Sequence, residues 1–462
     1  MHLAASDRSS SPAERMRWSL VSAQLVAVLA LGILPGSTVS PIRFCPCIPP
    51  NLCKPLPKNH KYQVENAQNI DPKKTPGQNV GIISHCDLAS LCKTEILVEI
   101  KGIVFDHSGP DWIHYDWSKI TTIVVTKSVP FELLCHAHAK GVRVIFKGNV
   151  DQKHLILPTE RKKWINSNLL YMKLQFLDGM HLETVEHISN LHELPKLVAQ
   201  VKTDVQNEIP GSQNDTAQEE CDCLLKHSVQ TQSSSYVVQH KTSSISIVAV
   251  VVSLSVPWTP NCPKGNCFDY VSMANSCDFL YVKAYDMQLE MWDECFAKAN
   301  APYHQTLSGL SNYIKLGVNP KKLILGLPWF GYDYPCEHFY EPGRCKLKML
   351  TFKGAPCSSQ IANQVEYKEI MQMLPRSITG RYWDDNYKSP YFVYKDKDVY
   401  HEVWYDDPES LSLKSSIVKK LKLGGIGAWF GNSLNYSANP TAAMQTEDMW
   451  NALCPIRLKW RT

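Results

Sequence analysis

The sequence predicts an α/β fold in which eight parallel strands close into a (β/α)8 barrel, a TIM barrel, with a small α+β insertion between strands seven and eight. Short runs of β-branched and other apolar residues alternate with longer amphipathic segments along most of the chain. Nearly unbroken apolar strands are typical of a parallel sheet buried on both faces. Eight such strands favour closure into a barrel over an open sheet.

The expected strands are apolar runs at 98–106, 120–125, 142–147, 176–182, 245–256, 279–285, 322–329 and 425–430. Between them, amphipathic segments predict helices at 131–140, 160–174, 191–208, 269–276, 306–316 and 408–421. The last helix has Asp407 in place to cap its first turn and Pro408 as its first residue, where the fixed φ of proline suits a helix. We therefore expect the barrel to span residues 97–455.

Three segments do not follow this alternation. Residues 332–406 are too long for a loop between a strand and a helix and contain short alternating runs, which predicts the α+β insertion on the catalytic face. Residues 214–245 are rich in Ser, Thr and Gln, which is typical of a flexible loop. Residues 41–96 form a segment that is rich in Cys and Pro at its start and has no clear period.

The composition excludes several classes of protein. With 44% hydrophobic and 20% charged residues, the chain of 462 residues is neither disordered nor fibrous. A formal net charge of +4 without long basic runs does not predict a surface that binds nucleic acid. The 12 Trp and 20 Tyr residues include the kinds of side chain that stack on sugar rings, although core packing is the more ordinary explanation of aromatic residues.

Several features indicate the secretory route. Basic residues precede an uncharged run at 18–34 and small residues follow it, which predicts a signal peptide over residues 1–40, with an uncleaved signal anchor as the alternative. Sixteen cysteines without an accompanying zinc motif predict disulfides rather than a metal site. The sequons at Asn214 and Asn435 predict glycosylation. We expect no membrane association after cleavage of the signal.

Three acidic residues lie in or directly after the fourth expected strand: Asp178, Glu183 and Glu186. Because side chains alternate on a strand, His181 and Glu183 share one face, and Glu186 faces the other way unless a bulge intervenes. A carboxyl group in a crowded, partly apolar pocket keeps its proton near neutral or acidic pH and suits general acid catalysis. The alternative is a solvated turn in which a Glu caps the next helix.

Motifs along the chain resemble those of a known enzyme family. Asp178-Gly179 followed by acidic residues is similar to the Asp-Gly-x-x-x-Asp-x-Glu signature of the family 18 glycoside hydrolases, the chitinase family. Further matching runs cover most of residues 100–455 and include Tyr115-Asp116-Trp117, Tyr285-Asp286, Pro328-Trp329-Phe330-Gly331-Tyr332-Asp333 and Gly425-Ile426-Gly427-Ala428-Trp429. The resemblance implies an enzyme that removes a reducing-end N-acetylglucosamine from the chitobiose core of N-linked oligosaccharides, in the lysosome or, alternatively, outside the cell.

The resemblance also implies roles for residues at the strand ends. Tyr285 matches a tyrosine that hydrogen-bonds the substrate's N-acetyl carbonyl, and Glu183 lies where an Asp orients the acetamide. Asp178, the first Asp of the signature, joins the catalytic set. The implied substrate-binding residues are Trp429, as the aromatic floor under the sugar, with Asp286 and Trp258. Without the resemblance, Tyr285 and Trp429 are ordinary barrel aromatics.

The mechanism implied by the resemblance is substrate-assisted retention. The acetamide oxygen attacks the anomeric carbon, so the protein supplies one acid/base and one group that orients the amide. No metal or organic cofactor is needed. The expected partner is an oligosaccharide that contains N-acetylglucosamine, and we expect a monomer.

The sequence departs from the family at the proton donor. Aligned without a gap, the donor position holds Val185, which has no titratable group. One extra residue at Thr184, accommodated as a bulge, would place Glu186 there. The bulged strand predicts an active enzyme, whereas the regular strand predicts a catalytically inactive lectin that binds N-acetylglucosamine oligomers. Residues 75–96 and 214–245 also have no counterpart that we can place in the family.

Overall fold

The structure is a computed structural model that describes residues 101–107, 109–184, 191–208, 250–261, 268–289, 295–348 and 362–453. All of these residues belong to one compact unit, Pro55–Thr462. The expected signal peptide at 1–40, the segment at 41–96 and the expected loop at 214–245 lie outside the described residues, as does Asn214.

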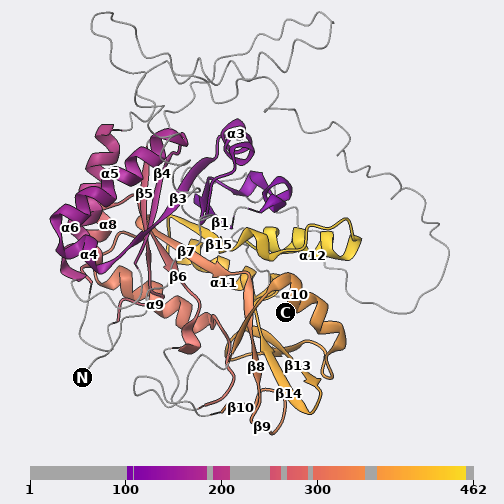
Figure 1. The fold of residues 1–462 in the computed structure, drawn as a ribbon. Helices are drawn as coiled ribbons and strands as arrows, with labels where there is room; N and C mark the ends of the chain where they lie inside the picture. The colour runs from indigo at the N-terminus through magenta and orange to yellow at the C-terminus, as the bar shows by residue number, and fades with distance from the viewer. Residues whose placement is uncertain are drawn as a thin grey trace, which may run out of the picture. The chain divides into compact units, whose positions relative to one another are not determined.

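Eight parallel strands form a closed barrel, which confirms the predicted fold class (Figure 1). Around the barrel the order is β1-β15-β7-β6-β5-β4-β3-β2, and β1 pairs with both β15 and β2. Each strand falls within or beside one of the eight expected apolar runs. The strands are β1 (Lys101–Asp106), β2 (Thr122–Val125), β3 (Arg143–Val150), β4 (Gly179–Thr184), β5 (Val251–Val256), β6 (Phe279–Lys283), β7 (Leu323–Pro328) and β15 (Gly425–Trp429).

Helices cover the outer face of the barrel (Figure 1). At the start of α11, the Asp407 carboxylate accepts a hydrogen bond from the backbone N–H of Ser410, and Pro408 is the first helical residue, as expected. The helices of this layer are α3 (Phe131–Ala139), α4 (Gln152–Ile156), α5 (Pro158–Leu174), α6 (Leu194–Glu208), α8 (Tyr270–Ser276), α9 (Tyr303–Lys315), α11 (Pro408–Lys420) and α12 (Pro440–Asn451). Short 3-10 turns are η1 (Pro110–His114), η2 (Trp117–Lys119), η3 (Leu191–Glu193), η4 (Met287–Leu289), η5 (Pro320–Lys322), η7 (Leu374–Arg376) and η8 (Gly431–Ser433).

The insertion follows β7 and contains a five-stranded antiparallel sheet in the order β11-β8-β14-β13-β12. This arrangement confirms the expected α+β insertion between the seventh and eighth barrel strands. A two-stranded ribbon, β9 with β10, is closed by the disulfide Cys336–Cys345. The elements are β8 (Phe330–Pro335), β9 (His338–Phe339), β10 (Cys345–Lys346), β11 (Asn363–Glu366), α10 (Tyr367–Met373), β12 (Tyr382–Asp384), β13 (Ser389–Asp396) and β14 (Val399–Trp404).

A fully buried ion pair lies where the insertion returns to the barrel. The Lys414 ammonium of α11 pairs with the Asp406 carboxylate, and Ser410 donates a second hydrogen bond to this carboxylate at 2.5 Å. Both charged side chains are at most 1% exposed. Because a buried charge without a partner is costly, this pair ties the end of the insertion to α11.

The barrel interior changes from apolar to polar along its axis. Inward-facing Phe105 and Tyr281 are completely buried, and their rings lie 4.7 Å apart. Towards the carboxyl ends of the strands, inward positions are occupied by His181, Glu183 and Lys283. Among the described residues, no helix is long and apolar enough to cross a membrane.

Candidate active site

The candidate site lies at the mouth of the barrel, where the carboxyl ends of all eight parallel strands meet. On β4, His181 and Glu183 both face the interior, as the alternation of side chains predicts. Lys147 of β3 and Lys283 of β6 point towards Glu183. This end of a (β/α)8 barrel is the one that carries catalytic residues.

An aromatic floor closes one side of the mouth. The Trp429 ring lies with its centroid 4.7 Å from that of Phe105, 4.0 Å from that of Phe430 and 6.1 Å from that of Tyr285. The Trp429–Phe430 peptide bond is cis. Unlike the fully buried Phe105 beneath it, Trp429 is partly exposed. The structure therefore brings the expected Tyr285 and Trp429 together.

His181 supports the site from below as an uncharged group. Its Nδ1 lies 2.8 Å from the Ser253 hydroxyl and its Nε2 lies 2.8 Å from the Ser255 hydroxyl. Burial lowers the pKa of His181 to about 3. Both ring nitrogens thus lie within hydrogen-bond distance of hydroxyls of β5, and burial keeps the imidazole uncharged near neutral pH.

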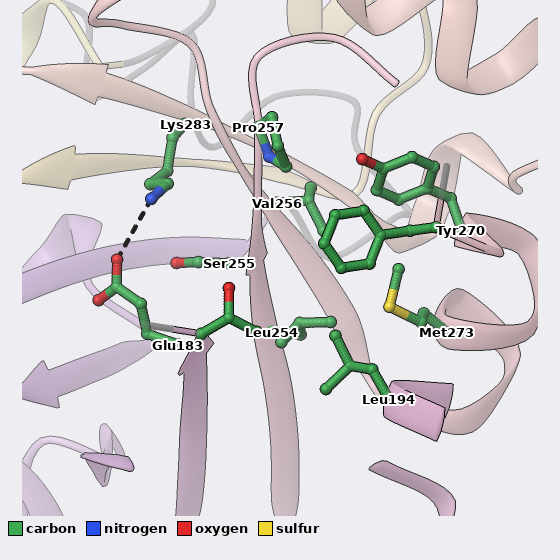
Figure 2. Close-up of a pocket in the computed structure, with 11 residues that line it drawn as sticks. Glu183, Leu194, Leu254, Ser255, Val256, Pro257, Tyr270, Met273 and Lys283 are labelled. Carbon is green, nitrogen blue, oxygen red and sulfur yellow. Dashed lines mark hydrogen bonds and ion pairs between the residues drawn. The ribbon is translucent and has the colours of Figure 1, made fainter. Parts of the chain in front are cut away.

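Glu183 is held between two ammonium groups. Its Oε2 lies 3.2 Å from the Lys147 Nζ and its Oε1 lies 3.3 Å from the Lys283 Nζ, and Figure 2 shows the second of these contacts. Burial by itself raises the pKa of the Glu183 carboxyl, but Lys283 and Lys147 more than offset this effect, so the pKa lies below its ordinary value. Glu183 is therefore an oriented carboxylate.

The hydroxyl groups of Tyr281 and Tyr285 are buried next to each other, and neither has a hydrogen-bond partner among the described residues apart from the other. Burial raises the pKa of both phenols far above their usual range, so both carry their protons. Because the Tyr285 hydroxyl keeps its proton, its O–H is suited to donate to a bound acceptor such as an amide carbonyl. This geometry agrees with the role that the family resemblance implies for Tyr285.

The expected catalytic role of Asp178 is wrong. Asp178 precedes β4 at the amino-terminal end of the barrel, where its carboxylate accepts from the Val144 backbone N–H at 2.7 Å and lies 2.8 Å from His138 Nε2. Asp278, before β6, makes the same kind of contact with the Val252 N–H. Both aspartates fasten the start of a strand to its neighbour, at the end of the barrel opposite to the mouth.

The other two expected substrate-binding residues have different surroundings. Asp286 follows β6 at φ +60°, and its carboxylate accepts from the Tyr332 hydroxyl of β8 at 2.8 Å, which joins the mouth to the insertion. Trp258, by contrast, packs beside Gly309 of α9 in the helix layer. Its expected contact with substrate stays a prediction.

The donor region is only partly described. Thr184 pairs with Val150 in the regular register of β3 and β4, so the bulge expected at Thr184 is absent from that position. Val185 and Glu186 lie outside the described residues. Thr184 lines a pocket whose polar side is formed by Glu183, Ser255 and Lys283. Its apolar side includes Leu254 and Met273, as Figure 2 shows.

The sequence analysis missed the two lysines and the two serines of this site. Ser253 and Ser255 are separated by one residue on an apolar strand, and Lys147 and Lys283 each end such a run. Polar residues at inward positions of a buried strand are the signal that could have found them. Within the described ranges, no group of three His, Cys, Asp or Glu side chains could hold a metal ion.

A closed (β/α)8 barrel with an ionised carboxylate, a protonated tyrosine and a partly exposed tryptophan at its mouth defines a glycosidase of the chitinase type. The chain matches the profile of "Glycosyl hydrolases family 18" over residues 154–431 and belongs to this family.

Curated relatives agree with this assignment. The chain is 34% identical over 453 residues to the di-N-acetylchitobiase of Homo sapiens, and the aligned residues cover 96% of this chain and 98% of the relative. It is 37% identical over 376 residues to the di-N-acetylchitobiase of Mus musculus, with 80% of this chain and 92% of the relative covered. The chain is thus a glycoside hydrolase similar to these enzymes.

Solved structures share the fold. A class V chitinase from Nicotiana tobaccum superposes with a TM-score of 0.54 at 17% identity, over 75% of this chain and 98% of the chitinase. A chitinase from Chromobacterium violaceum gives a TM-score of 0.54 at 11% identity, over 77% and 98% of the two chains.

Proposed function

We propose that the chain removes the reducing-end N-acetylglucosamine from the chitobiose core of N-linked oligosaccharides by substrate-assisted retention. The observation that carries this proposal is that a protonated hydroxyl, that of Tyr285, and an ionised carboxylate, that of Glu183, both lie at the carboxyl end of the barrel near Trp429. The similarity to the di-N-acetylchitobiases of man and mouse supports the choice of substrate.

In the proposed reaction, Trp429 stacks on the sugar and the Tyr285 O–H donates to the acetamide carbonyl. The Glu183 carboxylate accepts from the acetamide N–H and favours attack of the carbonyl oxygen on the anomeric carbon. As this bond forms, the bond to the glycosidic oxygen breaks and that oxygen takes a proton. Water then opens the cyclic intermediate at the anomeric carbon with retention of configuration.

Glu186 is the proposed proton donor. In sequence it follows the last residue of β4 by two positions, and its carboxylate would afterwards accept a proton from the attacking water. The Thr184 register favours a second candidate function: a regular strand points Val185 inward and leaves a lectin without an acid. A bulge that serves Glu186 would have to begin after Thr184.

The decisive experiment compares turnover and binding in a Glu186→Gln variant. Release of N-acetylglucosamine from a di-N-acetylchitobiosyl oligosaccharide, measured at pH 4–5, is expected to fall by roughly a hundredfold or more, with sugar affinity retained. Glu208→Gln, an exposed glutamate at the end of α6, is the matched control and retains turnover. Binding by the wild-type chain without turnover establishes the lectin instead.

The setting of this activity is part of the proposal. We infer a secreted chain that is delivered to the lysosome, acts as a monomer and carries a glycan at Asn435. The Asn435 side chain lies in the loop before α12 and is only half-buried, which leaves it room for a glycan. Loss of a mass increment after treatment with an N-glycosidase is the measurement.

A further inference from the structure

One carboxylate at the mouth of the barrel is held between two cations. Lys147 and Lys283 approach Glu183 from β3 and β6, at 3.2 and 3.3 Å, and each takes a different oxygen of the carboxylate. The three side chains are between 15% and 36% exposed, so solvent screens these ion pairs only partly. The two ion pairs keep Glu183 charged, and the hydrogen bond that Lys283 donates to Oε1 gives the carboxylate its direction.

The other groups that face Glu183 carry no charge. His181 on the same strand is neutral, and Ser255 of β5 is engaged with it. The buried phenols of Tyr281, in β6, and of Tyr285, two residues after it, keep their protons. Among the described residues, Lys147 and Lys283 have no other acidic partner, so these two lysines dominate the electrostatic surroundings of Glu183.

Without the lysines, Glu183 would be unsuited to an acidic compartment. Burial of this side chain favours the protonated form, and the ordinary pKa of a Glu carboxyl, 4.5, already lies within the acidic range. A protonated Glu183 has an oxygen that donates where a carboxylate accepts, and it would orient an acetamide N–H poorly. The two ammonium groups reverse the effect of burial.

We propose that Lys147 and Lys283 are positioning residues that hold Glu183 as an oriented carboxylate at the acidic pH at which the site works. They act through Glu183 and need no contact with the substrate. This inference rests on the proposed function, in which Glu183 accepts the acetamide N–H. The two lysines would then set the lowest pH at which the enzyme still binds and hydrolyses its substrate well.

The test uses Lys147→Met and Lys283→Met, which keep the length of the side chain and remove its charge. The affinity for a neutral N-acetylglucosamine oligomer and kcat/KM are measured between pH 3.5 and 7. Removal of one cation is expected to shift the acid limb of both profiles upward by roughly one pH unit, so that both quantities fall up to tenfold near pH 4.5. Lys283→Arg retains the charge and restores the wild-type profile.

Lys202→Met is the matched control, because Lys202 pairs with Asp278 at 2.8 Å at the opposite end of the barrel. It loses the same charge and keeps the wild-type pH profile. Profiles of Lys147→Met and Lys283→Met that coincide with this control overturn the proposal. If either Met variant does not fold, the Gln variant at the same position takes its place.

A pair of variants that lack the Glu183 carboxylate tests whether the lysines act through Glu183. On a Glu183→Gln background the titrating group is absent, so adding Lys283→Met leaves the pH dependence of affinity unchanged. A shift that persists on this background shows that the lysines act on another group, and it overturns the proposal. Affinity can be measured without turnover. If the wild-type chain binds the N-acetylglucosamine oligomer with the expected pH dependence but does not hydrolyse it, the proposed activity is overturned and the role of the lysines stands.

Discussion

Glu402 gives the insertion a dependence on pH that can be measured. Its side chain is completely buried in β14; Oε1 accepts from Trp404 Nε1 at 2.7 Å, and Oε2 accepts from the Gly343 N–H at 2.8 Å. Burial raises the pKa of Glu402 to about 7, although both donors act to lower it. The folded protein therefore binds this proton more tightly than the unfolded chain does.

The size of the effect follows from the shift. A rise from the ordinary value of 4.5 to about 7 corresponds to roughly 3 kcal/mol of unfolding free energy, since each unit is worth about 1.4 kcal/mol. The pKa is raised on folding, so this stabilisation is fully present below pH 4.5 and is lost as the pH rises through about 7. Glu402 thus makes the fold more stable in acid.

The assay is urea unfolding of the wild type and of Glu402→Gln between pH 4 and 8. Gln cannot titrate, so the difference in unfolding free energy between the two proteins should change by roughly 3 kcal/mol over this range. A constant offset is expected as well, because the amide NH2 faces a donor. Glu341→Gln, an exposed residue in the neighbouring turn, should run parallel to the wild type. Parallel curves for Glu402→Gln would refute the reasoning.

Three further changes test the packing and the floor of the site. Lys414→Met leaves Asp406 charged and buried, and urea unfolding should show a loss of about 3–5 kcal/mol; a loss below about 1 kcal/mol contradicts the ion pair. Gly179→Ala places a Cβ 1.9 Å from a carbonyl oxygen of β5 and should lower the melting temperature far more than Gly141→Ala, which has a positive φ but open space. Trp429→Ala should weaken oligosaccharide binding about tenfold by calorimetric titration, and unchanged affinity excludes it from the floor.

The barrel could be predicted from the sequence because its strands are buried on both faces. An unbroken apolar run, such as the one that forms β7, lacks the amphipathic period of a surface helix, and each of the eight runs contains a barrel strand in the structure. The helix α12 was missed, although Asn439 and Pro440 provide the same start signal that identified α11. Its apolar positions are few, which hid the period.

The candidate site was only partly predictable. The alternation of side chains on β4 correctly predicted that Glu183 and His181 point into the barrel, because this orientation depends on the sequence of one strand alone. Asp178 was misplaced because it lies five positions before Glu183 along an extended strand, about 16 Å away, so that residues close in sequence lie at opposite ends of the barrel. The pairing of Glu183 with Lys283 bridges strands that are 100 residues apart in sequence, and no local pattern reports it.

The junction between β7 and β8 has a consequence for engineering this enzyme. Only Trp329 separates the two strands; it is completely buried, and its ring meets that of Trp450 with 4.9 Å between the centroids. β8 is clamped on both edges by β11 and β14 and presents Tyr332 to Asp286 at the mouth. The ribbon of β9 and β10 lies beyond this clamp. The disulfide Cys336–Cys345 and the hydrogen bond from the Gly343 N–H to Glu402 fix the two ends of this ribbon, so new side chains are best introduced at exposed positions such as Tyr340, which leaves β8 in place.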